Sequence, residues 1–258
     1  MQKLHQLKTL IRHWFLAVDR HSLHGQFAYD LFEHTQRQAR PKMEALEQAR
    51  KKLLTDGQVL SYQDMGADKT IRNRTVKSLA ARSLSSPRMS SFFYLLTQWH
   101  QAQQIVELGT CLGVNTAYLS KATTGTVHTF EGIPQIAEQA QQLWEAQQLK
   151  NIRLTVGDID LRLPEFLNTA APIDLAFVDA NHTYEATLRY FEMLLPHCHQ
   201  NALLIFDDIY HSEGMTRAWE AIKNHPKVKM SFDYWRFGIV CLCPTISAKH
   251  YRIGFSWW

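Results

Sequence analysis

The sequence predicts an α/β protein with a doubly wound, mostly parallel sheet, an antiparallel final strand and an N-terminal helical appendage. From Gln104 onward, short apolar runs alternate with helical patterns, which is typical of repeated strand-helix units in a parallel sheet. Near the C-terminal end, two apolar runs flank Tyr234 to Arg236 with no helix between them, which favours a closing antiparallel hairpin. The front of the chain shows helical spacing instead.

Length and composition are those of an ordinary globular chain. The 258 residues suffice for one large α/β domain with an appendage, and 45% of them are hydrophobic while 20% are charged. No apolar run approaches the roughly 20 residues needed to cross a bilayer, so we expect no membrane span. Arg12 and His13 interrupt the first apolar segment, which argues against a secretion signal. The four cysteines show no C-x-x-C spacing, so we expect a reducing, cytoplasmic location.

The net charge of +4 is unevenly distributed. Residues 1–100 hold 16 of the 28 Lys and Arg residues but only 8 of the 24 Asp and Glu residues. A basic front can attract an anionic partner such as a nucleic acid or a phosphorylated substrate. Solvated helix faces explain the same charges, so both interpretations stay open.

The elements of the front are predicted from apolar spacing. Residues 4–18 and the stretch from Pro41 to Leu54 each fit a helix. A serine-rich segment with one proline, Ser83 to Ser91, is typical of a connector. We therefore divide the chain into an appendage over residues 1–88 and a main domain over residues 89–258.

Five strands are expected in the main domain, each ending at or just before a polar turn. They are Ile105 to Leu108, Val127 to Glu131, Ile152 to Val156, Leu175 to Asp179 and Leu203 to Asp207. Right-handed crossovers bring the carboxyl ends of such strands to one edge of the sheet, where ligands bind in open α/β folds. The sequence therefore predicts a ligand site at that edge.

A glycine turn follows the first of these strands. Gly109 and Gly113 bracket three residues, giving E-L-G-x-x-x-G between a strand and a helix. Glycines let the backbone approach a ligand, and the helix behind the turn directs N–H groups toward it. Glu131 closes the next strand 22 positions after Gly109, close to the offset at which an acid binds ribose hydroxyls in dinucleotide folds. The pair predicts a nucleotide-like cofactor, but Cys111 and Val114 replace the second and third glycines of a nicotinamide motif.

This pattern resembles the first motif of class I S-adenosylmethionine-dependent methyltransferases, in the variant of the catechol O-methyltransferase-like branch. The resemblance implies a Rossmann-like fold, with Glu107 and the turn around the methionine part of S-adenosylmethionine and Glu131 on the ribose. It also implies that Asp158 lies beside the adenine. The expected cofactor-binding residues are Glu107, Gly109, Thr110, Cys111, Gly113, Asn115, Glu131, Gly132, Asp158 and Asp179.

Three carboxylates follow the fourth and fifth strands. Asp179 ends one strand, and Asp207 and Asp208 end the next, so parallel pairing would bring them together. Hard oxygen ligands suit Mg²⁺ or another hard divalent cation. Metal-dependent members of the resembled branch use acids at these positions, which implies an ion that holds the acceptor and lowers the pKa of its hydroxyl. The alternative interpretation, without a metal, is that Asp208 only orients its loop and Asp179 only faces the cofactor.

A histidine follows the first of these acids. The segment "DANHTYE" resembles the D-G-D-H-S-Y-E segment of a broad methyltransferase group, some of whose members carry an acidic base where this chain has Asn181. Asp179 and His182 are therefore the catalytic candidates, because imidazole titrates near neutrality. Simple solvent exposure or helix-start polarity also explains His182.

The function predicted from these features is S-adenosylmethionine-dependent O-methylation of a small molecule, with the appendage as a lid. The whole chain also resembles a group of bacterial class I methyltransferases of this length seen in Bacteroidetes. The basic stretch from Arg72 to Arg88 leaves an RNA methyltransferase as a second hypothesis, ranked lower because no RNA-reading module accompanies it. A non-catalytic cofactor-binding protein is a third.

Two further segments carry open interpretations. The residues Asp64, Gly66 and Asp68 fit either a plain turn or part of an acceptor pocket. The aromatic end, with Phe255, Trp257 and Trp258, fits either packing on the domain or contact with another chain in a homodimer.

Overall fold

The computed structural model describes residues 2–63 and 70–254, and within them the chain forms two compact units. The first unit combines described residues 2–33 with 169–254, and the second comprises 34–63 with 70–168. The segments Asp64 to Asp68 and Phe255 to Trp258, for which the sequence left two interpretations, lie outside the described residues. None of the described helices is long and apolar enough to pass through a bilayer.

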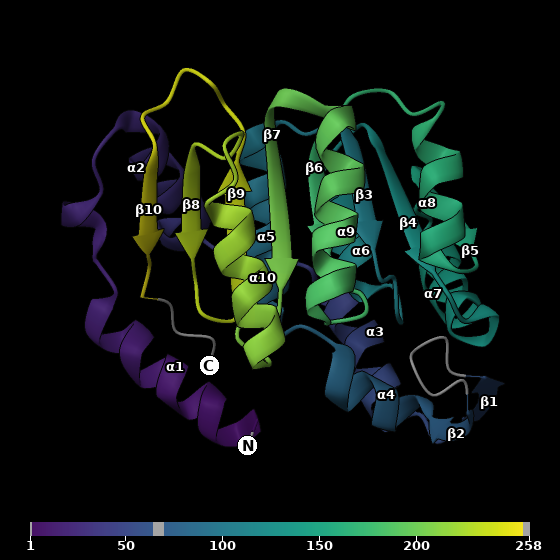
Figure 1. The fold of residues 1–258 in the computed structure, drawn as a ribbon. Helices are drawn as coiled ribbons and strands as arrows, with labels where there is room; N and C mark the ends of the chain where they lie inside the picture. Colours follow the sequence, from purple (N-terminus) through teal and green to yellow (C-terminus); the bar gives the residue numbers. More distant parts are fainter. Residues whose placement is uncertain (1, 64–69, 255–258) are drawn as a thin grey trace. The chain divides into compact units, whose positions relative to one another are not determined.

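The second unit contains a parallel three-stranded sheet in the order β3-β4-β5. Its strands are β3 (Gln104–Leu108), β4 (Thr126–Glu131) and β5 (Ile152–Val156). Its crossover helices are α6 (Val114–Ala122) and α7 (Pro134–Ala146), and α8 (Ile159–Leu167) follows β5. Helices α6 and α7 cover one face and α8 covers the other (Figure 1). The three strand predictions in this unit are confirmed.

The front of the second unit is not purely helical. It contains α3 (Glu44–Thr55), β1 (Val59–Gln63), β2 (Ile71–Thr75), α4 (Val76–Ser83) and α5 (Pro87–His100). The antiparallel β1-β2 pair was missed by the sequence analysis, because its strands are short and only Leu60 and Tyr62 of β1 are buried.

Helix α3 shares a core with the three-stranded sheet's helices. Leu46 of α3 packs in one buried cluster with Tyr118 of α6 and Trp144 of α7. The hydroxyl of Tyr118 also donates to Glu47 Oε1 at 2.7 Å. The division of the chain at residue 88 stays a prediction.

The first unit contains five strands among its described residues, in the order β10-β8-β9-β7-β6. They are β6 (Ile173–Val178), β7 (Cys198–Asp207), β8 (Met230–Asp233), β9 (Phe237–Cys241) and β10 (Lys249–Arg252). Strand β9 runs antiparallel to both β7 and β8, which confirms the predicted hairpin. Strand β10 runs parallel to β8 and was missed, because it is a short edge strand with exposed polar residues.

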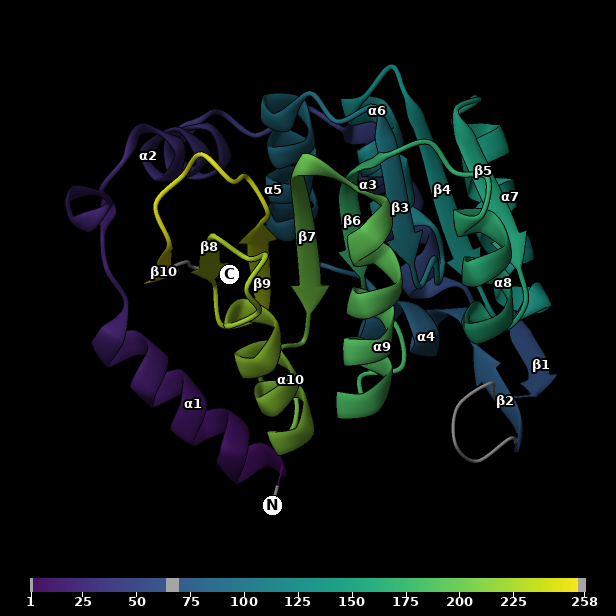
Figure 2. The same ribbon diagram turned by 45° about the horizontal axis from the view of Figure 1, so that its top comes forward.

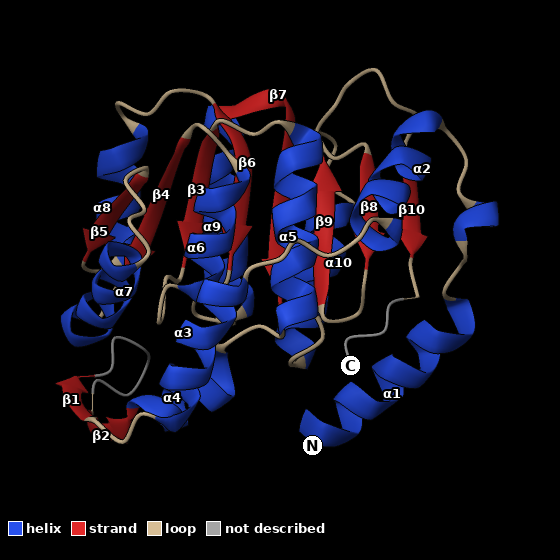
Figure 3. Cartoon of the chain, turned by 180° about the vertical axis from the view of Figure 1, so that it is seen from behind, coloured by secondary structure: helices blue, strands red, loops and turns tan. Residues whose placement is uncertain are grey.

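Helices cover both faces of this five-stranded sheet. Helices α9 (Tyr184–Leu194) and α10 (Glu213–Lys223) lie on one face, and the short α2 (Gln26–Phe32) lies on the other (Figure 3). Among the described residues, short turns of 3-10 or π helix add Arg20–Ser22, Glu33–Arg37 and Leu195–His197.

Helix α1 (Gln2–Leu16) extends from the first unit near α10 (Figure 2). It is held by polar contacts: Gln6 Nε2 donates to the backbone oxygen of His211 at 3.0 Å, and His5 contacts Thr216 of α10 at 2.8 Å. Its apolar stripe, predicted from spacing, remains exposed, and the side chains of Trp14 and Phe15 are each 73% exposed.

Gly238 of β9 makes a close helix-to-strand contact that tests the packing of the first unit. A Cβ atom at Gly238 would lie 2.4 Å from the ring of Trp219 on α10, which is fully buried. We expect Gly238→Ala to lower the free energy of unfolding by about 1–3 kcal/mol, because the ring has no room to move. Urea denaturation measures this. The matched control is Gly57→Ala, where an added Cβ meets nothing within 4 Å, and equal stability of the two variants would contradict the packing.

Candidate functional site

The glycine turn between β3 and α6 adopts a conformation that needs its glycines. Gly109 has φ +99° and Gly113 has φ +74°, both in the left-handed region that favours glycine. A Cβ atom at Gly113 would lie 2.7 Å from both Ala140 Cβ and Trp144 Nε1. The indole N–H of Trp144 donates to the backbone oxygen of Gly113 at 2.8 Å. Helix α7 therefore fixes the end of the turn at the start of α6.

Glu131 joins this turn to the end of β4. Its Oε2 accepts the backbone N–H of Cys111 at 2.8 Å, and its Oε1 accepts the N–H of Ile133 at 3.0 Å. Burial raises the pKa of Glu131, while these N–H groups and that of Gly132 lower it. The acid and the glycine turn, paired in the sequence analysis only by spacing, are thus in direct contact.

A second buried acid lies behind the turn. Glu107 Oε2 accepts the hydroxyls of Thr116 and Thr129 at 2.5 and 2.7 Å, and its Oε1 accepts Asn115 Nδ2 at 2.9 Å. The pKa of Glu107 is raised to about 6, mainly by burial, while the hydrogen bonds from Thr116, Thr129 and Asn115 lower it and the charge of Glu131 adds a smaller increase. Asn115 Oδ1 is buried and has no hydrogen-bond partner among the described residues. This group of side chains therefore presents an unused buried acceptor at the turn.

The remaining cofactor candidates of the second unit have visible structural roles. Thr110 Oγ1 contacts Thr129 Oγ1 at 2.6 Å inside the same buried network. Asp158 caps α8 by accepting the N–H of Asp160 at 2.9 Å. Gly157, with φ +133°, donates its N–H to the backbone oxygen of Glu131 at 2.9 Å. The carboxyl ends of β3, β4 and β5 are therefore linked around Glu131.

In the first unit, the predicted acids gather at the ends of β6 and β7. Asp179 follows β6, Asp207 is the last residue of β7 and is 3% exposed, and Asp208 follows with φ +56°. The pKa of Asp207 is raised to about 8, mainly by burial and next by the charge of Asp179, while Arg236 opposes the shift.

The cation among these acids is Arg236, which the sequence analysis did not single out. Its Nη1 lies 2.9 Å from Asp208 Oδ1, and its Nε lies 3.6 Å from Asp207 Oδ1. Burial lowers the pKa of Arg236, but the three carboxylates raise it above its usual value. Arg236 lies in the predicted hairpin turn, but its position beside the acids depends on the pairing of Phe237 with Asp207 across β9 and β7, which the sequence alone does not show.

Two histidines border the acids. His182 Nε2 lies 3.5 Å from Asp179 Oδ1, His211 Nδ1 lies 3.8 Å from Asp208 Oδ2, and the two rings are 6.0 Å apart. His182 has φ +33° and Asn181 has φ +62°, which strains a loop that Asn181 Nδ2 supports by donating to the hydroxyl of Tyr190 at 2.6 Å.

No set of three or more His, Cys, Asp or Glu side chains in the described part of the chain has the geometry to hold a metal ion. The predicted metal ligands Asp179, Asp207 and Asp208 are close enough to affect one another's charge, but Arg236 lies among them. A small cavity of about 70 Å³ borders this cluster, lined in part by Asp208, His211 and Arg236. The acids therefore face both a guanidinium and a small opening.

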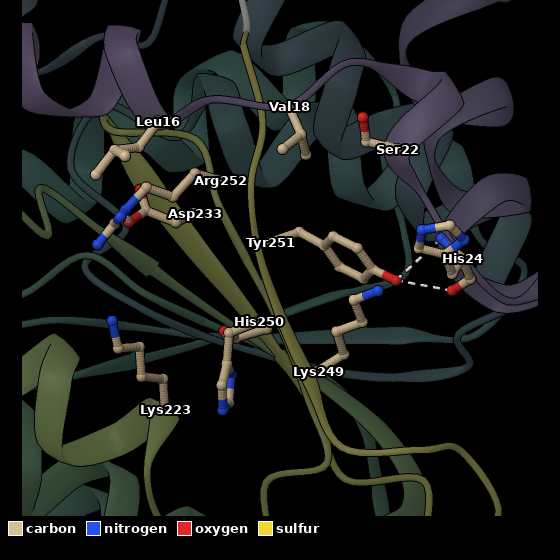
Figure 4. Close-up of a pocket in the computed structure, with 11 residues that line it drawn as sticks. Leu16, Val18, Ser22, His24, Lys223, Asp233, Lys249, His250, Tyr251 and Arg252 are labelled. Carbon is tan, nitrogen blue, oxygen red and sulfur yellow. Dashed lines mark hydrogen bonds and ion pairs between the residues drawn. The ribbon is translucent and has the colours of Figure 1, made fainter.

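A larger cavity of about 400 Å³ lies at the β10 edge of the first unit (Figure 4). Two of its cations are paired: Lys223 contacts Glu220 at 2.6 Å, and Arg252 lies 3.8 Å from Asp233. Tyr251 donates its hydroxyl to the backbone oxygen of His24 at 2.7 Å. These contacts join the residues that line the cavity to one another and to neighbouring elements of the first unit.

Comparison with known proteins identifies the chemistry. Residues 106–209 match a family described as a methyltransferase domain. The catechol O-methyltransferase of Niastella koreensis is 28% identical over 155 residues, which cover 58% of this chain and 69% of that enzyme. The protein-L-isoaspartate O-methyltransferase of Ignicoccus hospitalis is 29% identical over 39% of this chain, but this match spans only 47% of that enzyme.

A solved structure shows the same fold. The O-methyltransferase from Bacillus cereus in complex with S-adenosylhomocysteine has a TM-score of 0.62 and 22% identity, covering 78% of this chain and 91% of that one. The fold class predicted from the sequence is confirmed. Residues 106–209 contain a methyltransferase domain, and the chain is similar to S-adenosylmethionine-dependent methyltransferases of catechol O-methyltransferase-like type. The resemblance noted in the sequence of this methyltransferase is likewise confirmed, whereas its individual site residues stay predictions.

Glu107 gives this methyltransferase a testable pH dependence. Its pKa is raised to about 6 in the folded chain from an ordinary value of 4.5, so the folded state binds the proton more tightly. As the pH rises from about 4.5 to about 6, the free energy of unfolding should therefore fall by about 2 kcal/mol. Above about pH 6 this group should cause no further loss of stability. Glu107→Gln should remove this part of the pH dependence in urea denaturation. Glu145→Gln, at an exposed position, is the control, and an unchanged slope in Glu107→Gln would refute the assignment.

Proposed function

We propose that this methyltransferase binds S-adenosylmethionine at the glycine turn of the second unit and methylates an oxygen of a small molecule. The observation that carries the proposal is the contact of Glu131 with the turn. Its two carboxylate oxygens each accept one backbone N–H group and keep a further lone pair for a ligand hydroxyl. Vicinal ribose hydroxyls match two such acceptors.

The residues behind the turn suit the methionine part of the cofactor. Asn115 Oδ1, buried and without a partner among the described residues, can accept a hydrogen bond from an ammonium group. Glu107, which holds Asn115 through its Nδ2, adds a negative charge beside that acceptor once ionised. When bound, the sulfonium supplies an electrophilic methyl group. We assign Gly109, Thr110, Cys111 and Gly113 to backbone contacts with this part, and Gly132 and Asp158 to the adenosine side.

The first unit supplies the groups that handle the acceptor's proton. Asp179 Oδ1 lies 3.5 Å from His182 Nε2, close enough to orient the imidazole. We propose His182 as the general base, oriented by Asp179. Asp207, which is 3% exposed and faces Arg236, is not assigned as the base.

The divalent ion expected from the sequence does not fit this arrangement. A cation site needs several carboxylate oxygens that converge on one open point. Here Asp208 Oδ1 is bound by Arg236 at 2.9 Å, and the same guanidinium lies 3.6 Å from Asp207 Oδ1. Mg²⁺ is therefore given no step in the proposed reaction.

One cation of the basic front is used inside the protein, which leaves the stretch from Arg72 to Arg88 as the basis of the RNA alternative. Arg50, one cation of this front, is buried and paired with Glu47 at 3.0 Å, so it is not available to a phosphate. The pairing of Asp179 with His182 likewise supports turnover over a role in cofactor binding alone. A cytoplasmic location and a lid formed from the front of the chain belong to the same proposal.

Calorimetry with S-adenosylhomocysteine tests the cofactor assignment. Wild-type protein should bind it, and Glu131→Ala should weaken binding at least about tenfold, because two ribose acceptors and the anchor of the turn are lost. Glu138→Ala, at an exposed position on α7, should bind like wild type. Absence of wild-type binding at millimolar ligand, or unchanged affinity in Glu131→Ala, would refute the proposal.

A further inference from the structure

We propose that Arg236 takes the place of a divalent ion in the acid cluster, so that this methyltransferase works without a metal and loss of Arg236 opens a metal site. The cluster comprises Asp179, Asp207 and Asp208. The assignment of these acids to the acceptor's site rests on the proposed function. The claim that the guanidinium of Arg236 lies where a divalent ion would bind these acids rests on geometry alone.

The contacts of Arg236 show a cation placed between two strand ends. Its Nη1 contacts Asp208 Oδ1 at 2.9 Å, and its Nε faces Asp207 Oδ1 at 3.6 Å. Asp179 is near enough to stabilise the same charge. A guanidinium nitrogen 2.9 Å from Asp208 Oδ1 takes up space that a metal ion bound to this oxygen would need. A divalent ion at this point would also meet the guanidinium's positive charge at close range, which is strongly unfavourable in a partly buried site.

The hairpin between β8 and β9 holds Arg236 in this position. Trp235 has φ +62°, an uncommon conformation for a bulky residue, and its N–H donates to Asp233 Oδ1 at 2.9 Å. The indole Nε1 of Trp235 donates to Thr9 Oγ1 of α1 at 3.3 Å. The N–H of Arg236 donates to the backbone oxygen of Tyr234 at 2.7 Å. The side chain therefore starts from a turn anchored on both sides.

The strand register then directs this turn to the acids. Phe237 pairs with Asp207 across β9 and β7, so Arg236 lies one residue beyond the last strand pair, at the level of Asp208. Asp208 has φ +56°, so both partners of the 2.9 Å contact lie in or beside strained turns. Such strain gathered around one ion pair is typical of functional sites.

Manganese binding to the full-length chain tests the proposal directly. Free Mn²⁺ is followed by electron paramagnetic resonance during titration of wild type, Arg236→Met and the double variant Arg236→Met with Asp208→Asn. Wild type should leave the added Mn²⁺ free into the millimolar range. Arg236→Met should bind one Mn²⁺ at least about tenfold more tightly than wild type, because three carboxylates lose their cation. The double variant should lose this gain.

Two control variants show whether a gain in Mn²⁺ binding is specific to the loss of the Arg236 charge. Arg217→Met removes an exposed arginine of α10 that stacks on Tyr184, and it should bind Mn²⁺ like wild type. Arg236→Lys keeps the charge and should also remain free of Mn²⁺, which covers the case in which Arg236→Met fails to fold. Tight wild-type binding that Asp208→Asn abolishes would overturn the proposal. A folded Arg236→Met variant with no gain would overturn it as well.

The two proposals fail separately. S-adenosylhomocysteine binding is measured on the same wild-type preparation, and its absence would count against the proposed function only. The Mn²⁺ titration contains no cofactor, so its result concerns Arg236 and the acids alone.

Discussion

The second unit depends on one interaction, the acceptance of the Cys111 and Ile133 N–H groups by the carboxylate of Glu131. This carboxylate ends β4, yet it holds the turn that follows β3, so two neighbouring strand ends share one anchor. Burying a charge is costly unless hydrogen bonds compensate for the lost water. The backbone donors supply that compensation, and the proposed nucleoside contact uses the lone pairs that remain on Glu131.

Charge compensation also organises the first unit. Three carboxylates at the ends of β6 and β7 would repel one another without a nearby cation, and Arg236 provides one from the β8-β9 hairpin. The antiparallel strand β9 thus does more than close the sheet, because its register sets where the guanidinium lies. His182 and His211, beside Asp179 and Asp208, lie at the border of the cluster.

The sequence predicted the parts of this structure that depend on local pattern. Apolar runs located the strands of the parallel sheet, and glycine spacing located the turn with its partner Glu131. The β1-β2 hairpin and β10 were missed because their strands are short and largely exposed, so they carry little periodic signal. Arg236 was missed for another reason: its role depends on the pairing of β9 with β7, which composition does not reveal. The metal ion was predicted from the three acids alone, because Arg236 was not recognised as their counter-charge.

A crystal structure of the complex with S-adenosylhomocysteine tests the central claim most directly. The account predicts both ribose hydroxyls within about 3 Å of the Glu131 carboxylate oxygens, with the ligand's ammonium group near Asn115 Oδ1. A nucleoside bound elsewhere on the chain, with Glu131 contacting only backbone N–H groups, would contradict it.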